Sequence, residues 1–398
     1  MSALSRVLAR YPVATVALSQ FFGTSVWFSA NSAADDLSRA WGLQPADLGW
    51  LVNCTQAGFI VGTSVFALTG LADRFAASRI FACCAVLAAV LNGSFALLSG
   101  GLASASVYRF LVGLCLAGIY PVGMKLIVSW APERAGAALS LLVGMLTLGT
   151  ALPHGVRAMG HMLDWRVVIL ASSGLALCSA VVMAQLGDGP HLKSRPAGGA
   201  GGLGAVWHVW REPTFRASAL GYFGHMWELY ACWTLLPMLL AQSVLAQAPG
   251  GVSAMAFAIM AVGALGCVLG GWLGRRIGSA RVALGALMGS GACAVVSSVW
   301  GRSLPAPWLM ALLLCWGLTV IADSPHFSAL SSRASPPHLV GSALALQNAV
   351  GFGLTLVAIG LTTRHVGQMG WSVVWWLVPG PVMGVWALWP LAKSAPPA

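Results

Sequence analysis

The chain has 398 residues, of which 58% are hydrophobic and only 8% are charged, and its formal net charge is +11. A soluble globular protein carries about a quarter of its residues as Asp, Glu, Lys and Arg, because its surface must be hydrated. This composition therefore excludes a soluble globular protein and predicts a chain that is surrounded by lipid. The basic residues stand in small groups between apolar runs, which argues against a continuous nucleic-acid-binding face.

Apolar runs bounded by charges, Pro or Gly predict an all-α polytopic membrane protein with twelve transmembrane helices, at about 20 residues per span. The six predicted helices of the first half are 12–34, 47–70, 80–99, 105–130, 136–156 and 166–186. Those of the second half are 216–242, 253–273, 281–300, 306–332, 341–362 and 372–391. The Gly-rich stretch between the halves is typical of a flexible linker. We therefore expect an N-terminal six-helix bundle (1–186), a cytoplasmic linker (187–215) and a C-terminal six-helix bundle (216–398).

The loop charges predict the orientation of the chain. If both termini are cytoplasmic, 14 Lys and Arg residues outside the spans fall on the cytoplasmic side and five on the other. This bias follows the positive-inside rule and needs an even number of spans. The first apolar run is too long for a signal peptide, so we interpret it as the first span. The nine cysteines all lie in predicted spans, which leaves no disulfide framework between loops.

An internal repeat appears at an offset of about 200 residues. The second span is followed by Gly70-Leu-Ala-Asp73-Arg74, and the eighth by Gly271-Trp-Leu-Gly274-Arg275. After the fourth span stands Pro132-Glu-Arg-Ala-Gly-Ala-Ala-Leu, and after the tenth Pro337-His-Leu-Val-Gly-Ser-Ala-Leu. Two matches at corresponding places indicate duplicated halves, the architecture of many secondary transporters.

Three of these segments carry a family resemblance. The loop Gly70-x-x-Asp73-Arg74-x4-Arg79 resembles the signature loop of the major facilitator superfamily (MFS), and the segment from Gly271 to Arg281 its weaker counterpart. Arg109-x3-Gly113 resembles the fourth-helix motif of that family. The resemblance implies two pseudo-symmetric six-helix bundles around a central cavity that opens alternately to each side. The fifth span lacks the Gly-Pro pair of the family's exporters, so the export signature is at best partial.

Four charged residues lie inside predicted spans: Arg109, Lys125, Glu228 and Asp323. A charge near the bilayer centre costs several kcal/mol without a partner or a watery cavity, so such residues mark functional sites. The resemblance implies that the first, fourth, seventh and tenth helices line the cavity, and these charges occupy three of the four. Steps of four, three and four residues place the polar and aromatic residues of the first span on one face. The predicted substrate cavity comprises Gln20, Thr24, Trp27, Asn31, Arg109, Lys125 and Trp227.

The second half offers candidates for proton coupling. Glu228 lies near the middle of its span with His225 one turn earlier, and Asp323 is followed one turn later by His326. Low dielectric favours the protonated form of a carboxyl group, and imidazole titrates near neutral pH, so both can exchange protons. The alternative is that His225 and Glu228 only hydrogen-bond each other and lock the packing of the helices.

Three further groups allow more than one interpretation. Arg109 is near a span end and could instead hydrogen-bond backbone carbonyls, and Lys125 could extend its ammonium group to the interface. Trp227 could stack on a substrate or belong to the interfacial aromatic belt. A cytoplasmic gate is predicted at Gly70, Asp73, Arg74, Arg79, Gly271 and Arg275.

These features predict a secondary active transporter that moves a small organic solute across the inner membrane by alternating access, coupled to protons. The alternatives are an anion exchanger or uniporter that uses Arg109 and Lys125, and a non-transporting receptor or assembly protein of the same fold. The chain has no phosphate-binding Gly-x4-Gly-Lys-Ser/Thr loop, and its residues do not show the spacing of a catalytic nucleophile or of metal ligands. We therefore expect that the protein is not an enzyme and has no cofactor and no metal site. The expected partners are the substrate, protons and the bilayer, with no nucleic acid, and the protein is expected to be a monomer.

Overall fold

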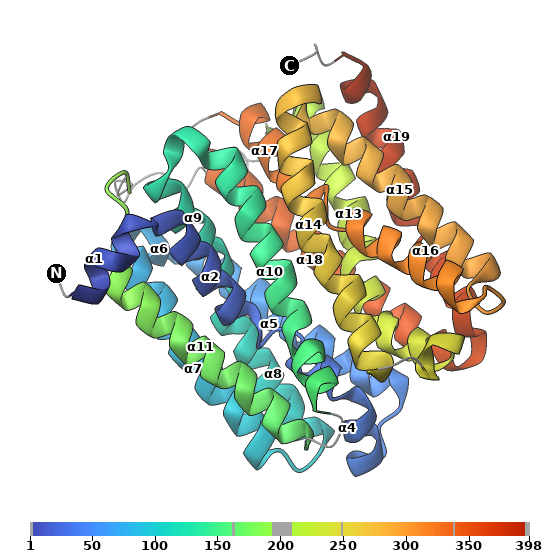
Figure 1. The fold of residues 1–398 in the computed structure, drawn as a ribbon. Helices are drawn as coiled ribbons and strands as arrows, with labels where there is room; N and C mark the ends of the chain where they lie inside the picture. Colours follow the sequence, from blue (N-terminus) through green and yellow to red (C-terminus); the bar gives the residue numbers. More distant parts are fainter. Residues whose placement is uncertain (1–2, 161–163, 193–208, 248–249, 337–338, 395–398) are drawn as a thin grey trace. The chain divides into compact units, whose positions relative to one another are not determined.

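The computed structural model describes residues 3–160, 164–192, 209–247, 250–336 and 339–394, and its regular elements in these ranges are helices (Figure 1). They form two compact units, residues 1–198 and 199–398. Each unit is described below by itself.

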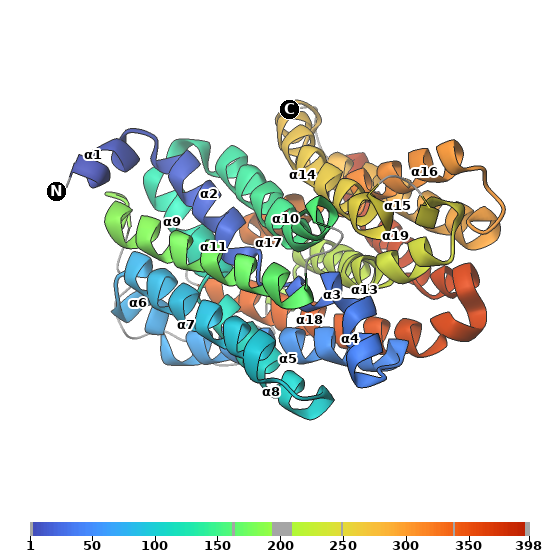
Figure 2. The ribbon, with the colours of Figure 1, turned by 60° about the horizontal axis from the view of Figure 1, so that its bottom comes forward.

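The first unit begins with a short amphipathic helix and continues through six membrane segments. Its helices are α1 (Ala3–Arg10), α2 (Pro12–Thr24), α3 (Ser29–Ser32), α4 (Ala34–Trp41), α5 (Pro45–Thr69), α6 (Leu71–Arg74), α7 (Ala77–Leu98), α8 (Leu102–Leu116), α9 (Tyr120–Trp130), η1 (Pro132–Arg134), α10 (Ala135–Met159) and α11 (Trp165–Leu186). Figure 2 shows α7 beside α11, and α5 beside α8.

The second unit follows the same order of long segments. Its helices are α13 (Pro213–Ala241), η2 (Val244–Gln247), α14 (Gly251–Ile277), α15 (Ser279–Trp300), α16 (Ala306–Thr319), α17 (Ser324–Ala334), α18 (Val340–Met369), η3 (Gly370–Trp376) and α19 (Pro379–Ser394). Each of the twelve predicted spans thus coincides with a helix or a broken pair of helices.

Nine stretches of the described chain are long and apolar enough to cross a membrane, and the last, Ala343–Lys393, covers most of both α18 and α19. The first and seventh predicted spans are not among them. The first is divided into helices too short to qualify, and α13 carries His225, Glu228 and several aromatic residues. These two segments do not meet the requirements of length and hydropathy, because they contain polar residues or breaks inside the membrane. Such features are expected of a transport path.

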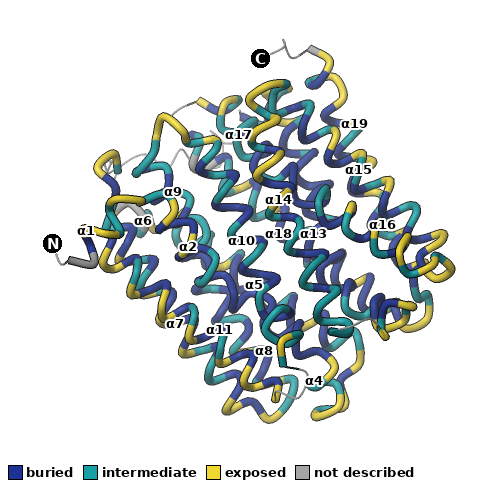
Figure 3. The backbone as a smooth tube through the Cα atoms, viewed as in Figure 1, coloured by how far each residue is buried: buried dark blue, intermediate teal, exposed yellow. Residues whose placement is uncertain are grey.

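The outer faces of the helices are apolar, the reverse of a soluble protein. On α7, for example, Val86, Leu87, Val90 and Leu97 are all exposed, while the polar Asn92 is fully buried. Figure 3 shows this alternation of exposed and buried positions along the helices of each unit. Such a surface is stable only where lipid replaces water.

Four predicted spans are interrupted rather than continuous, the twelfth of them at residues 377–378 between η3 and α19. The first is broken at residues 25–28, the fourth at 117–119 and the tenth at 320–323. Pro121 and Pro325 stand in the first turns of α9 and α17, where a missing N–H group is tolerated. The break in the fourth span directly precedes the turn that contains Pro121. The break in the first span has no proline and was not expected.

Reciprocal glycine contacts join the second and fourth membrane segments of each unit. In the first unit a methyl group on Gly58 would clash with the carbonyl oxygen of Phe110, and one on Gly113 with that of Thr55. In the second unit Gly266 faces the Leu318 carbonyl oxygen and Gly317 that of Ile259 in the same way. Small residues allow membrane helices to approach backbone to backbone. The two units therefore share a packing device that the loop repeats alone did not reveal.

We expect Gly58→Ala to destabilise the protein by about 1–3 kcal/mol, because the added methyl group would overpack the α5–α8 crossing. Gly174→Ala is the matched control, since nothing lies within 4 Å of a methyl group added there. Thermal unfolding in detergent measures both. Equal melting temperatures for the two variants would contradict this account of the crossing.

The chain directly after α11 contacts the ends of two other helices. Both carboxylate oxygens of Asp188 accept hydrogen bonds from backbone N–H groups at the start of α7, from Ala77 at 3.2 Å and Ser78 at 2.7 Å. The His191 N–H donates to the carbonyl oxygen of Ser129 at 3.2 Å. The first residues of the predicted linker thus fasten α7, α9 and α11 together at one end of the first unit. Residues 193–208 of that linker lie outside the described part of the chain.

Candidate functional site

Glu228 is the centre of a buried polar cluster in the second unit. Its side chain is 1% exposed, and its two oxygens accept from different helices. Oε1 accepts from the indole Nε1–H of Trp316 on α16 at 2.7 Å, and Oε2 accepts from the hydroxyl of Ser290 on α15 at 2.9 Å. A buried carboxyl group therefore ties α13 to two neighbouring helices through neutral donors, with no cation paired to it among the described residues.

The two donors differ in what they can do. An indole N–H can only donate, whereas a serine hydroxyl can donate or accept. Ser290 Oγ also lies 3.3 Å from the carbonyl oxygen of Leu287. If Glu228 is protonated at Oε2, the carboxyl group can donate to Ser290, and the Ser290 hydroxyl can then donate to Leu287. The cluster can therefore satisfy both the ionised and the protonated carboxyl group.

His225 and Asp323 meet one turn away from this cluster. Nδ1 of the imidazole lies 2.8 Å from Oδ1 of the carboxylate, without the alignment of a hydrogen bond. Both side chains are 1% exposed, and the imidazole ring packs against Tyr222 and Phe327, at centroid distances of 6.0 and 5.8 Å. Asp323 occupies the break between α16 and α17, so the interruption of the tenth span places its carboxylate beside α13.

His326 lies apart from this pair, on the side of α17 that faces α14. Its ring packs against Gly270 and Gly274, and a methyl group on Gly274 would clash with it. The four residues predicted for proton coupling thus all lie in the buried interior of the second unit. The structure brings His225 and Asp323 into contact and gives Glu228 and His326 separate surroundings.

Arg109 holds together the broken first span of the first unit. Its guanidinium group donates to the carbonyl oxygens of Val26 (3.1 Å) and Trp27, both inside the break at residues 25–28. It also donates to Thr55 Oγ1 at 3.1 Å and Asn92 Oδ1 at 3.1 Å. All three guanidinium nitrogens are used within the unit, and the side chain is 1% exposed. This geometry favours the backbone-bonding interpretation of Arg109 over direct substrate contact.

The polar residues predicted along the first span are buried together in the first unit. Asn31 Oδ1 lies 3.1 Å from Nε2 of His154 on α10, and the Trp27 indole donates to Gln56 Oε1 at 3.1 Å. Thr24 donates to the carbonyl oxygen of Gln20 at 2.8 Å. The Gln20 amide is fully buried, and neither of its polar atoms has a hydrogen-bond partner among the described residues. An amide in this state is a candidate for binding a polar group of a ligand.

Lys125 and Trp227 have different surroundings. Lys125 is half-buried on α9. The Trp227 indole donates to the carbonyl oxygen of Trp376 at 2.7 Å, and its side chain packs against Gly380 at the start of α19. These contacts favour a packing role for Trp227.

The predicted gate residues lie at helix ends. Gly70 ends α5 with φ of 66°, a left-handed conformation that favours glycine, and α6 follows at once. Arg74, Arg79 and Arg275 are exposed, and Gly271 is half-buried on α14. The side chain of Asp73 lies outside what the structure describes.

Several partners of these residues were not predicted from the sequence. Asn92 carried a detectable signal, as a polar residue in the middle of the apolar third span. Ser290 and Trp316 did not, because serines and tryptophans are frequent throughout the chain and nothing in the spacing links them to Glu228. Their role depends on three helices that meet only in the folded unit.

The comparisons with known proteins agree with this architecture. The sequence profile described as Major Facilitator Superfamily matches residues 16–360. The chain is 24% identical over 322 residues to the niacin transporter NiaP of Acinetobacter baylyi, a match that spans 67% of this chain and 66% of that relative, just under two thirds of its length. It is 23% identical over 357 residues to the 4-hydroxybenzoate transporter PcaK of the same organism, covering 80% of this chain and 76% of that one.

A solved structure shows the same fold. The bacterial homolog of the human lysosomal transporter Spinster, in an inward-facing and unoccupied conformation, superposes with a TM-score of 0.66. The match covers 98% of this chain and 96% of that one at 15% identity. With these relatives, the profile match across most of the chain places it in a family of multi-pass membrane transporters. The chain belongs to the major facilitator superfamily.

Proposed function

We propose that this transporter moves a small organic solute by secondary active transport, driven by protons. The observation that carries the proposal is the buried Glu228 carboxyl group, which has a neutral donor at Oε1 and the reversible donor Ser290 at Oε2. A proton can therefore be held at Oε2 and released again without leaving a buried polar atom unsatisfied. The contact of His225 with Asp323 offers a second proton-exchanging pair in the same unit.

We further propose a small aromatic carboxylate as the substrate class. The names of the two bacterial relatives give niacin and 4-hydroxybenzoate as their substrates. Both compounds are compact aromatic rings with one carboxylate. The first unit supports this with an aromatic cluster of Trp27, Phe59 and Tyr120, whose ring centroids lie 5.1 to 6.4 Å apart. Such a cluster suits the flat face of an aromatic ring. Lys125, on the same helix as Tyr120, is the proposed counter-charge of the carboxylate.

The proposed arrangement follows the sequence analysis. The bundles 1–186 and 216–398 enclose a cavity that opens alternately to each side of the membrane, and residues 187–215 connect them. The proposed location is a cell's inner membrane, with both termini cytoplasmic. The proposed cytoplasmic gate carries the charged residues Asp73, Arg74, Arg79 and Arg275.

Uptake into proteoliposomes tests the proposal. Purified protein should accumulate labelled niacin or 4-hydroxybenzoate when the lumen is alkaline and stop when a protonophore removes the gradient. Lys125→Gln should weaken uptake by about tenfold or more through the lost counter-charge, while Arg134→Gln, outside the spans, serves as control. Transport that ignores the pH gradient but exchanges internal for external carboxylate would instead support the anion exchanger. Uptake of neither compound would reject the proposed substrate class.

A further inference from the structure

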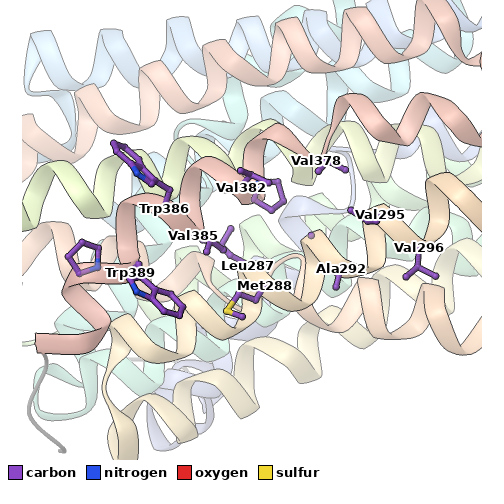
Figure 4. A pocket seen from close by; sticks show the side chains of 13 residues that line it. Leu287, Met288, Ala292, Val295, Val296, Val378, Val382, Val385, Trp386 and Trp389 are labelled. Atoms are coloured by element: carbon purple, nitrogen blue, oxygen red, sulfur yellow. The ribbon is translucent and has the colours of Figure 1, made fainter.

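A groove crosses the outer surface of the second unit between α15 and α19. It has a volume of about 860 Å³, and none of its 13 lining residues is charged. Figure 4 shows side chains of both helices directed into it, with Met288 and Trp389 toward one end and Val296 and Val378 toward the other. Val382 is 60% and Trp386 72% exposed, so the groove opens outward from this unit.

The length of the groove matches one leaflet of a bilayer. Its lining on α15 runs from Leu287 to Val296, a rise of about 14 Å along the helix. The hydrocarbon core of one leaflet is about 15 Å deep. An acyl chain that enters at one end of the groove would therefore reach the other end near the bilayer centre.

Two cations stand at the Trp389 end of the groove. The Lys393 ammonium group lies 5.2 Å from the centre of the Trp389 ring, which lines the groove. Arg281 stands six residues before Leu287 and donates from Nε to the carbonyl oxygen of Ala392 at 3.3 Å. This bond brings the start of α15 and the end of α19 together, so that both positive charges lie at the same mouth.

The second unit has few carboxylates with which such cations could pair. Its sequence, residues 199–398, contains nine Lys and Arg residues but only Glu212, Glu228 and Asp323 as acidic residues. Glu228 and Asp323 are buried in the interior. Basic groups at the mouth of a membrane-facing groove attract lipid phosphates, the anions available at a bilayer surface.

We propose that this groove is a binding site for one anionic phospholipid, with an acyl chain between α15 and α19 and the phosphate beside Lys393 and Arg281. The charge count assigns this mouth to the cytoplasmic side, where basic groups attract anionic lipid. The inference does not depend on which solute the protein carries.

Native mass spectrometry of the full chain tests the site directly. Protein in detergent is equilibrated with equal amounts of phosphatidylglycerol and phosphatidylcholine that carry the same acyl chains. We expect phosphatidylglycerol to be retained preferentially, and Lys393→Gln to reduce this preference by about fivefold. Arg276→Gln is the matched control, since this cation stacks on Trp272 of α14, 3.9 Å from the ring centre and outside the groove.

A second pair of variants tests the acyl-chain part of the site. Ala292→Phe should fill the groove and remove both lipids, and the smaller Ala292→Leu should leave intermediate retention. Leu269→Phe, at an exposed position of α14, should retain lipid like the natural chain. Equal retention of the two lipids, equal effects of Lys393→Gln and Arg276→Gln, or full retention by both Ala292 variants would each overturn the proposal.

Discussion

Replacing Glu228 by Gln is expected to abolish accumulation of the substrate while leaving substrate exchange intact. The Gln amide has nearly the same shape, so its oxygen can accept from Trp316 and its amino group can donate to Ser290. Ser290 can then donate to the Leu287 carbonyl oxygen. The variant therefore resembles the protonated carboxyl group and preserves the packing, but it cannot release a proton.

The expected magnitude follows from the driving force. A gradient of one pH unit supplies about 1.4 kcal/mol per proton, which supports about tenfold accumulation at one proton per solute. Glu228→Gln should lose this accumulation entirely, whereas counterflow between labelled and unlabelled substrate should continue. Proteoliposome uptake with and without a pH gradient separates the two activities.

The matched control is Glu212→Gln, the same chemical change at an exposed carboxyl group just before α13. This variant should accumulate substrate like the natural chain. Accumulation by Glu228→Gln at the level of Glu212→Gln would rule out Glu228 as the coupling residue and leave the His225–Asp323 pair as the candidate.

Replacing Arg109 by Met is expected to destabilise the first unit by about 1–3 kcal/mol, the cost of leaving a buried acceptor without its donor. The change would remove the Arg109 donor from the carbonyl oxygen of Trp27 and leave that of Val26 with only the Ser29 hydroxyl, at 3.1 Å. It would also leave Asn92 Oδ1 with fewer donors, although Ser29 still donates to it at 2.8 Å. Each buried acceptor left without a donor costs about 1–3 kcal/mol. Arg109→Lys should lose less, because one ammonium group can serve some of these acceptors.

Thermal unfolding of the purified variants in detergent measures this effect. Arg166→Gln is the control, because Arg166 lies at the surface beside Asp164 and its side chain is 45% exposed. If Arg109→Met melts like the natural chain and loses only substrate binding, then Arg109 is a substrate ligand and its network of backbone bonds is of minor importance to stability.

The membrane segments could be predicted to within a few residues at most helix ends, although α18 (Val340–Met369) extends beyond the predicted 341–362. The predicted helix 166–186 is α11 (Trp165–Leu186), and 281–300 is α15 (Ser279–Trp300). In lipid, a backbone segment that crosses the core must be helical, so an apolar run of sufficient length has few alternatives. The breaks beside Pro121 and Pro325 could also be predicted from the local sequence, because proline lacks the backbone N–H group that a continuous helix needs.

The break in the first span could not be predicted from the local sequence. Nothing between Ser25 and Phe28 resembles a helix breaker, and the carbonyl oxygens it exposes are satisfied by Arg109, more than 80 residues later in the chain. Sequence periodicity reports only which face a residue occupies on its own helix. It could identify Arg109 as an unusual buried charge, but it could not identify what that charge binds.

The sequence by itself therefore determined the membrane-spanning class, the duplicated halves and the set of buried polar residues, because each follows from composition or from spacing along one chain segment. Only the tertiary structure decided which partner each of these buried polar residues binds. In the folded units Arg109 donates hydrogen bonds to the backbone of the first span, and Trp227 donates one to η3. Glu228 accepts hydrogen bonds from Ser290 and Trp316. The physical reason is that hydrogen bonds in a helical membrane protein form between helices that are distant in sequence, where the partner depends on packing alone.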